Sequence, residues 1–158
     1  MVQAPALHRI LLLVLVAGLA VSSYAAFEVL QPALQGVCTV NAFFSCSAVD
    51  RSGLTSIGPV PDWLIGVGGF AAMLLLDVLL VRSYSARLLQ AITLLALAGL
   101  AVSGYLAYVE LGLIHALCPV CVAAYAADAG ALAVCLMLWR LRRTAGAEPE
   151  RNSIRPAA

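Results

Sequence analysis

The stretch that decides the fold comprises residues 117–138, LCPVCVAAYAADAGALAVCLML, in which Asp128 carries the only formal charge. An α-helix needs about 20 predominantly apolar residues to cross the hydrocarbon core of a bilayer. Three other stretches are similarly long and apolar, at residues 10–30, 63–81 and 88–109. The sequence therefore predicts an all-α fold, an integral membrane bundle of four transmembrane helices at about 10–30, 63–81, 88–109 and 117–140.

The composition of the whole chain supports this prediction. The 158 residues are 63% hydrophobic and 11% charged, and the mean hydropathy is +1.01. Soluble domains carry about 25% charged residues, so the composition excludes a soluble enzyme and a nucleic-acid-binding protein. We expect a four-helix membrane domain over residues 1–143 and a polar cytoplasmic tail over residues 144–158.

The arginines indicate how the helices are oriented. With four crossings, both termini and the connection at residues 82–87 lie on one side of the membrane, together with eight of the nine arginines. The other side has only Arg51, in the long connection at residues 31–62. Since positive residues accumulate on the cytoplasmic side, we expect a multi-pass protein of the cell inner membrane with cytoplasmic termini and a long extracytoplasmic loop between its first two helices. A cleaved signal peptide in place of the first helix is the alternative, and it would leave the other helices unchanged.

Four of the five cysteines converge on the outer face. Cys38 and Cys46 lie in the long loop, and Cys118 and Cys121 form a C-P-V-C motif at the outer start of the fourth helix. Cys135 follows 14 residues after Cys121, about 21 Å deeper along a helix. We therefore expect two cysteine pairs that face the periplasm or exterior, and a fifth cysteine that only packs against its neighbours.

The C-P-V-C motif is more typical of a redox group than of a structural bridge. A bridge between Cys118 and Cys121 would close a very small loop and constrain the unfolded chain little, whereas the start of a helix favours a reactive thiolate. Two exchangeable pairs at one face predict a relay from a soluble partner to an acceptor dissolved in the lipid, which implies a quinone. Two inert structural bridges, or a metal site with four thiolates, are the alternatives; we expect no metal.

Polar side chains continue below the motif on the same helix face, because Tyr125 and Asp128 follow Cys121 at spacings of four and three residues. The Tyr125 hydroxyl is expected either to donate to a quinone oxygen or to bond a neighbouring helix. Asp128 lies close to mid-bilayer, where an acid is a functional candidate. The interpretation that we favour for Asp128 is nevertheless a protonated or hydrogen-bonded packing acid that meets Ser103 or Ser22.

The order of these residues resembles that of the vitamin K epoxide reductases and their bacterial homologues. The resemblance covers nearly the whole hydrophobic part of the chain, with two cysteine pairs in the same order on four helices. The matching residues are Ser23, Tyr24, Ala25, Val29, Cys38, Cys46, Ser47, Val49, Ser52, Gly66, Ser103, Tyr105, Leu106, Ala107, Cys118, Cys121 and Tyr125.

The resemblance implies a four-helix bundle around a quinone, capped on the outside by the long loop. It also implies a role for each member of the two cysteine pairs. Cys121 would lie next to the quinone, Cys118 would exchange with Cys46, and Cys38 would meet the partner protein.

Three further residues are implied to bind the quinone. Ser52 matches a family Ser or Thr near the quinone pocket, and Tyr125 matches a Tyr that bonds a quinone oxygen. Asp62 stands where relatives often carry an Asn that bonds the quinone. An ionised carboxylate only accepts hydrogen bonds, so Asp62 departs from the family pattern. Glu110 and His115, at the outer end of the third helix, are expected to be plain interfacial residues, with a proton relay as the alternative.

Many bacterial relatives carry a fused thioredoxin-like domain that this sequence lacks, so we expect a stand-alone protein with a DsbA-like thioredoxin-fold partner in trans. The implied function is a membrane thiol:quinone oxidoreductase, which reoxidises this periplasmic partner, passes electrons to ubiquinone or menaquinone and supports disulfide bond formation. Its partners would be that protein, the quinone and the lipid bilayer, with no nucleic acid. A quinone or vitamin K epoxide reductase working in the reductive direction, and a Cys-based metal transporter, are the alternatives.

Overall fold

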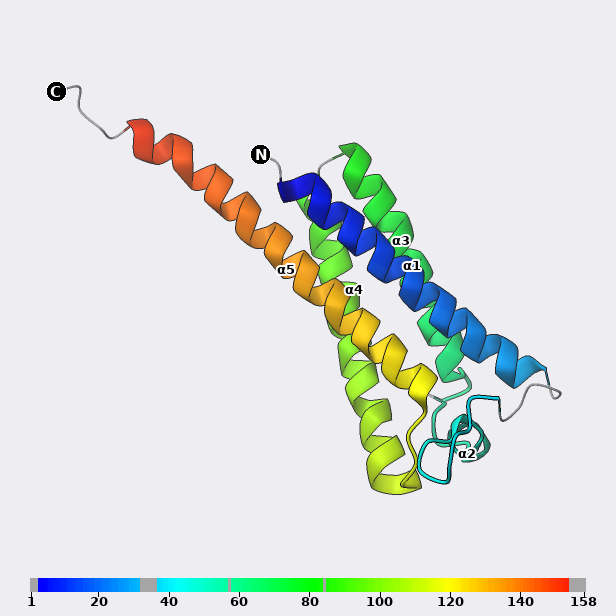
Figure 1. Cartoon of the computed structure of the whole chain (residues 1–158). Coiled ribbons are helices and arrows are strands. Elements are labelled where there is room, and N and C mark those ends of the chain that lie inside the picture. The colour runs from blue at the N-terminus through cyan, green and yellow to red at the C-terminus, as the bar shows by residue number, and fades with distance from the viewer. Residues whose placement is uncertain (1–2, 32–36, 57, 84, 154–158) are drawn as a thin grey trace.

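The computed structural model describes residues 3–31, 37–56, 58–83 and 85–153, and its architecture is all-α (Figure 1). Four long helices form a bundle, as the sequence predicts. A short helix lies in the loop between the first two long helices, and a π-helical turn follows the third. The elements are α1 (Gln3–Leu30), α2 (Cys46–Arg51), α3 (Asp62–Ser83), α4 (Ala86–Val109), η2 (Glu110–Ile114) and α5 (Pro119–Ser153).

All four long helices are long and apolar enough to cross a membrane, which identifies a multi-pass membrane protein. The segments that meet this criterion are Pro5–Leu30, Asp62–Ser83, Ala86–Ile114 and Pro119–Arg143.

Two helices extend more than five residues beyond the predicted bounds. Helix α1 begins at Gln3, before the predicted start at residue 10, and α5 continues to Ser153, past the predicted end at residue 140. Hydropathy marks only the apolar part of a helix, whereas the residues beyond it include good helix formers such as Ala, Arg and Glu. The polar stretch after residue 143 therefore begins as a continuation of α5.

The helices pack in a closed ring in which α1 contacts α3 and α5, and α4 contacts the same two helices. The start of α1, the end of α5 and the adjacent ends of α3 and α4 lie at one end of the bundle, which we call the termini end (Figure 1). The loop with α2, the turn η2 and the start of α5 lie together at the opposite end, the loop end (Figure 1).

The apolar core is built from residues of all four long helices. Its fully buried side chains include Leu11 and Leu15 of α1, Leu80 of α3 and Leu89 of α4. Cys135 of α5 lies in the same cluster with no exposed surface, so the prediction that it packs against its neighbours is confirmed. Close-packed contacts of this kind hold membrane helices together, because lipid tails are as apolar as the side chains.

Candidate active site

A short stretch of backbone pairing joins the loop to the segment that precedes α5. The Ser45 N–H donates to the Leu117 carbonyl at 3.1 Å, and the Leu117 N–H donates to the Phe43 carbonyl at 2.7 Å. These bonds form an isolated parallel bridge between Phe44 and Leu117. Cys46 and Cys118 each follow a bonded residue, so the register of this bridge brings two cysteines that are 72 residues apart to the same place.

The loop around the first cysteine pair is held by local polar contacts. The Asn41 side chain accepts the backbone N–H groups of Phe43 and Phe44 at 2.9 and 2.8 Å, which forms a tight turn. Ser45 then caps the start of α2 by accepting the Ala48 N–H at 3.2 Å. Cys46 is the first residue of α2 and is consequently fixed in direction.

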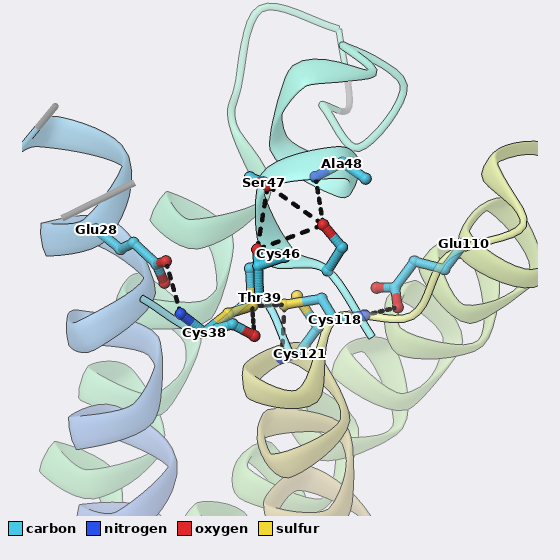
Figure 2. The surroundings of a disulfide bond; sticks show 10 residues. Glu28, Cys38, Thr39, Cys46, Ser47, Ala48, Glu110, Cys118 and Cys121 are labelled. Carbon is cyan, nitrogen blue, oxygen red and sulfur yellow. Dashed lines mark hydrogen bonds between the residues drawn. A yellow bond between two sulfur atoms is a disulfide. The ribbon is translucent and has the colours of Figure 1, made fainter. Parts of the chain in front are cut away.

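Cys38 and Cys46 form a disulfide, with their Cα atoms 5.8 Å apart. Glu28 at the end of α1 accepts the Cys38 backbone N–H at 3.4 Å, which ties the disulfide to the bundle (Figure 2). Cys46 is only 2% exposed, whereas Cys38 is half-buried. Cys38 is therefore the sulfur of this pair that another protein can reach.

The sulfur of Cys118 lies 3.1 Å from the sulfur of Cys46, on the side of the disulfide that faces α5 (Figure 2). Cys118 is a free cysteine and is 3% exposed. Thiol–disulfide exchange requires a thiolate that contacts one sulfur of a disulfide. The arrangement can therefore pass a disulfide between Cys46 and Cys118 without a large movement.

The Cys118 sulfur occupies the capping position at the start of α5. It accepts the Cys121 backbone N–H at 3.3 Å, as a capping side chain does at a helix N-terminus. This contact fixes the direction of the sulfur that lies next to Cys46.

Glu110 lies at the site, for which the sequence suggested it only in the alternative of a proton relay. It was expected to be a plain interfacial residue, and this expectation is wrong because its side chain is fully buried. One carboxylate oxygen accepts the Cys118 backbone N–H at 3.0 Å, and the other accepts the Tyr125 hydroxyl at 2.7 Å. Glu110 thus links Cys118, which contacts the disulfide, to Tyr125, which lies one turn below Cys121.

The π-helical turn explains why Glu110 points inward. Residues 110–114 form η2, which ends at His115 in a left-handed conformation with φ of 56°. The Ala116 N–H then returns to the Glu110 carbonyl at 3.1 Å. Such π-turns are common at functional sites, but nothing in the sequence of this segment distinguishes one from the end of an ordinary helix. His115 is exposed, in keeping with an interfacial position.

An apolar cavity of about 230 Å³ lies beside Cys121, between the four long helices. An engineered cavity of about 150 Å³ is known to admit benzene, so this one has room for a substituted ring. Most of its wall is aliphatic or aromatic. The polar residues in the wall are Ser22, Asp62, Ser103, Cys121, Tyr125 and Asp128.

The predicted quinone-binding residues are placed differently from one another. Tyr125 and Asp62 both line the cavity. Asp62 is the first residue of α3, and its carboxylate accepts the Trp63 N–H at 2.8 Å. Ser52 does not line the cavity; it ends α2, donates its hydroxyl to the Val49 carbonyl at 2.7 Å and accepts the Leu54 N–H at 3.2 Å.

Acidic residues gather around the loop end near the disulfide. Asp50 of α2 lies at the surface, and partial desolvation, followed by the negative charges of Asp62 and Glu28, raises its pKa from 3.8 to about 6. Above this pH the loop end therefore carries a local concentration of negative charge.

The sequence left a metal site as an alternative for the same cysteines. The sulfurs of Cys38, Cys46 and Cys118 all lie within 4.8 Å of one another. A structural zinc ion takes four ligands, and across residues 3–31, 37–56, 58–83 and 85–153 no fourth His, Cys, Asp or Glu joins this group. Because two of the three sulfurs are bonded to each other, the cluster suits exchange better than coordination of zinc.

Four membrane-spanning helices with three contacting cysteines at one end define a multi-pass membrane protein suited to thiol–disulfide exchange. The chain belongs to the vitamin K epoxide reductase family, whose family model matches residues 9–136. The resemblance found in the sequence is thus confirmed. No curated protein matches the chain significantly. Membership implies thiol–disulfide oxidoreductase activity, and quinone is the typical electron acceptor in this family.

Proposed function

We propose that this protein is a membrane thiol:quinone oxidoreductase that reoxidises a thioredoxin-fold partner of the DsbA kind and so supports disulfide bond formation. The observation that carries the proposal is the 3.1 Å contact between the Cys46 and Cys118 sulfurs, next to an apolar cavity lined by Cys121. In this proposal the Cys38–Cys46 pair meets a soluble electron donor, and Cys121 of the second pair meets an apolar electron acceptor in the cavity.

The proposed orientation puts the loop end outside the cytoplasm. In the sequence, eight of the nine arginines flank the helix ends that form the termini end of the bundle. Arginines close to membrane spans remain on the cytoplasmic side. The exported side of a bacterial inner membrane is oxidising and is where stable disulfides form. A partner that makes disulfides there must pass its electrons to a protein with exposed cysteines on that side.

In the first step a thiolate of the reduced partner attacks Cys38, the more accessible sulfur of the Cys38–Cys46 disulfide. A mixed disulfide forms and Cys46 leaves as a thiolate. The second thiol of the partner then resolves the mixed disulfide. The partner departs oxidised, and its two electrons remain on Cys38 and Cys46.

In the second step Cys46 attacks Cys118 of a Cys118–Cys121 disulfide, and Cys121 leaves as a thiolate. Attack by Cys38 on Cys46 then restores the first disulfide and leaves Cys118 reduced. The arrangement in Figure 2, with Cys38 bonded to Cys46 and both Cys118 and Cys121 free, corresponds to the end of this step.

In the third step Cys118 and Cys121 return to the disulfide, and the quinone takes up two electrons and two protons. Tyr125 and Asp62 are the proposed quinone-binding groups, because both line the cavity that contains Cys121. Glu110 acts as a positioning residue, since it holds the Tyr125 hydroxyl at 2.7 Å and the Cys118 N–H at 3.0 Å. Ser52 lies outside the cavity wall, at the end of the helix that begins with Cys46, so its proposed part in quinone binding is indirect.

The order of the relay is tested by quinone reduction with two electron donors, a reduced thioredoxin-fold partner and a small dithiol such as dithiothreitol. We expect Cys121→Ala to abolish quinone reduction with both donors. We expect Cys38→Ala to abolish quinone reduction with the protein partner only. A small dithiol, unlike a protein, can reduce the disulfide between Cys118 and Cys121 without first exchanging with Cys38. If Cys38→Ala lost quinone reduction with both donors, as Cys121→Ala is expected to, the result would contradict the proposed order.

A further inference from the structure

Asp128 is a buried acid that the steps above do not use. It lies in α5, is 4% exposed and lines the cavity beside Cys121 and Tyr125. Neither of its carboxylate oxygens has a hydrogen-bond partner within the described part of the chain. An unpaired carboxyl group in an apolar site is costly in free energy, and in a membrane segment such a residue is a functional candidate.

The hydrogen bonds expected of Asp128 in a packing role are not formed within the described part of the chain. Ser22 and Ser103 share the cavity wall with Asp128, yet neither bonds its carboxylate within the described residues. Buried polar groups without a partner in a native structure are rare and call for an explanation. A bound molecule that supplies the missing partner is one such explanation, and the cavity provides the space for it.

The position of the carboxyl group is set by a close approach of α4. A methyl group at Gly99 would lie 2.7 Å from one Asp128 carboxylate oxygen and 2.9 Å from the other. Only a glycine leaves the room that this carboxyl group occupies. The helix contact thus holds the side chain in place without forming a hydrogen bond to it.

Three side chains of α5 then line the cavity in a row. Cys121, Tyr125 and Asp128 are separated by four and three residues and so share one helix face. Asp128 lies about 4.5 Å further along the axis than Tyr125, a step comparable to the width of one aromatic ring. A ring that packs beside Cys121 and Tyr125 in the cavity therefore extends to the level of Asp128.

We propose that Asp128 binds the oxygen of the quinone that lies farther from the loop end. This inference rests on the proposed function and names the polar contact at the deep end of its substrate site. A carboxylic acid donates a hydrogen bond to a carbonyl, and a carboxylate accepts one from a hydroxyl. Asp128 consequently has a bonding mode for the oxidised ligand and another for the reduced ligand.

The test measures binding of 2-methyl-1,4-naphthoquinone to the purified full-length protein in lipid nanodiscs. Trp63 lines the cavity, so its fluorescence quenching reports binding in a Trp139→Phe background without any turnover. We expect Asp128→Leu to weaken binding by about tenfold or more. We expect Asp128→Asn to retain most of the affinity, because its amide also offers a donor and an acceptor.

Two comparisons make the result specific. Asp77→Asn alters another buried acid, which bonds His8 at 3.3 Å and is not part of the cavity wall, and it should leave the affinity unchanged. The second ligand is 2-methyl-1-tetralone, which lacks one of the two ring oxygens. Asp128→Leu and the smaller Asp128→Ala should both lose the preference for the quinone over this ketone, whereas Asp128→Asn should keep it.

The possible outcomes separate the two proposals. Failure of the unaltered site to bind the naphthoquinone would overturn the proposed quinone reduction itself. Binding by the unaltered site together with equal or tighter binding by Asp128→Leu and Asp128→Ala would overturn the role of Asp128 alone. If Asp128→Leu fails to fold, Asp128→Ala decides the matter in the same way.

Discussion

The two ends of the bundle are held together by different kinds of interaction. In the core that extends toward the termini end, leucines such as Leu11, Leu80 and Leu89 are fully buried against one another. At the loop end the described residues form a small buried cluster of Cys46, Val49, Ala116 and Cys118, with partly buried neighbours around it. The loop end is instead held by directed hydrogen bonds from backbone and carboxylate groups.

This difference separates stability from chemistry within one small protein. Apolar packing is non-directional and tolerates substitutions that conserve volume, so the core serves to keep four helices together. Each hydrogen bond at the loop end has one specific partner, and its loss leaves a buried polar group unpaired. Substitutions in the core should therefore act mainly on stability, and substitutions at the loop end mainly on exchange.

The largest expected effect comes from removing one buried cysteine at each end. We expect Cys118→Ala to abolish quinone reduction driven by the reduced protein partner, because the sulfur that contacts Cys46 is lost. Cys135→Ala should keep full activity and lower the free energy of unfolding by about 1 kcal/mol, the cost of a small cavity. Activity assays and thermal unfolding of both variants measure these effects. An activity loss in Cys135→Ala similar to that in Cys118→Ala would break the distinction between the two ends.

A smaller effect is expected at Glu110. Glu110→Leu leaves the Tyr125 hydroxyl and the Cys118 N–H without their acceptor, at a cost of about 1–3 kcal/mol for each unpaired group. We expect quinone reduction to fall by roughly tenfold to hundredfold, and Glu110→Gln, which retains one acceptor oxygen, to be less affected.

A double-mutant cycle sharpens this prediction for Glu110. In a Tyr125→Phe background the hydroxyl is already absent, so Glu110→Leu should have a smaller additional effect on the rate. Fully additive effects of the two substitutions would show that the bond between Tyr125 and Glu110 does not matter for activity.

The smallest expected effect concerns pH and Asp50. Its pKa is raised in the folded protein from 3.8 to about 6, so the folded state holds this proton more strongly than the unfolded state. The resulting stability is fully present below about pH 4 and is lost as the pH rises through about 6. We expect Asp50→Asn to flatten the decrease in melting temperature across this window, as measured by thermal unfolding at several pH values. An unchanged pH profile in Asp50→Asn would assign the decrease to other groups.

Much of the site could be predicted because the spacing of residues along one helix is set locally. The apolar stretches predict four spans, and the placement of Cys118 and Cys121 at the start of a span follows from their position in the sequence. The face shared by Cys121, Tyr125 and Asp128 follows from helix periodicity, and all three side chains line the cavity.

The prediction was less successful where residues from different elements meet. Glu110 was expected at the membrane interface, yet its inward direction depends on the π-turn η2 and on the approach of α5. Ser52 lies outside the cavity wall at the end of α2, so its part in quinone binding stays a prediction. Neither the start of a π-turn nor the direction of a loop helix leaves a periodic signal in the sequence.

The amino-acid sequence by itself determined the number of spans, the charge bias between the two ends and the convergence of two cysteine pairs on one end. These properties follow from apolar length, charge placement and helix periodicity, which depend on neighbours along the chain. Only the tertiary structure decided that Cys46 contacts Cys118 and that Glu110 bonds Tyr125. It also decided that Asp128 lines a cavity and has no hydrogen-bond partner among the described residues. These features depend on the distances between groups on different elements, and those distances are set by how the helices and the loop pack together.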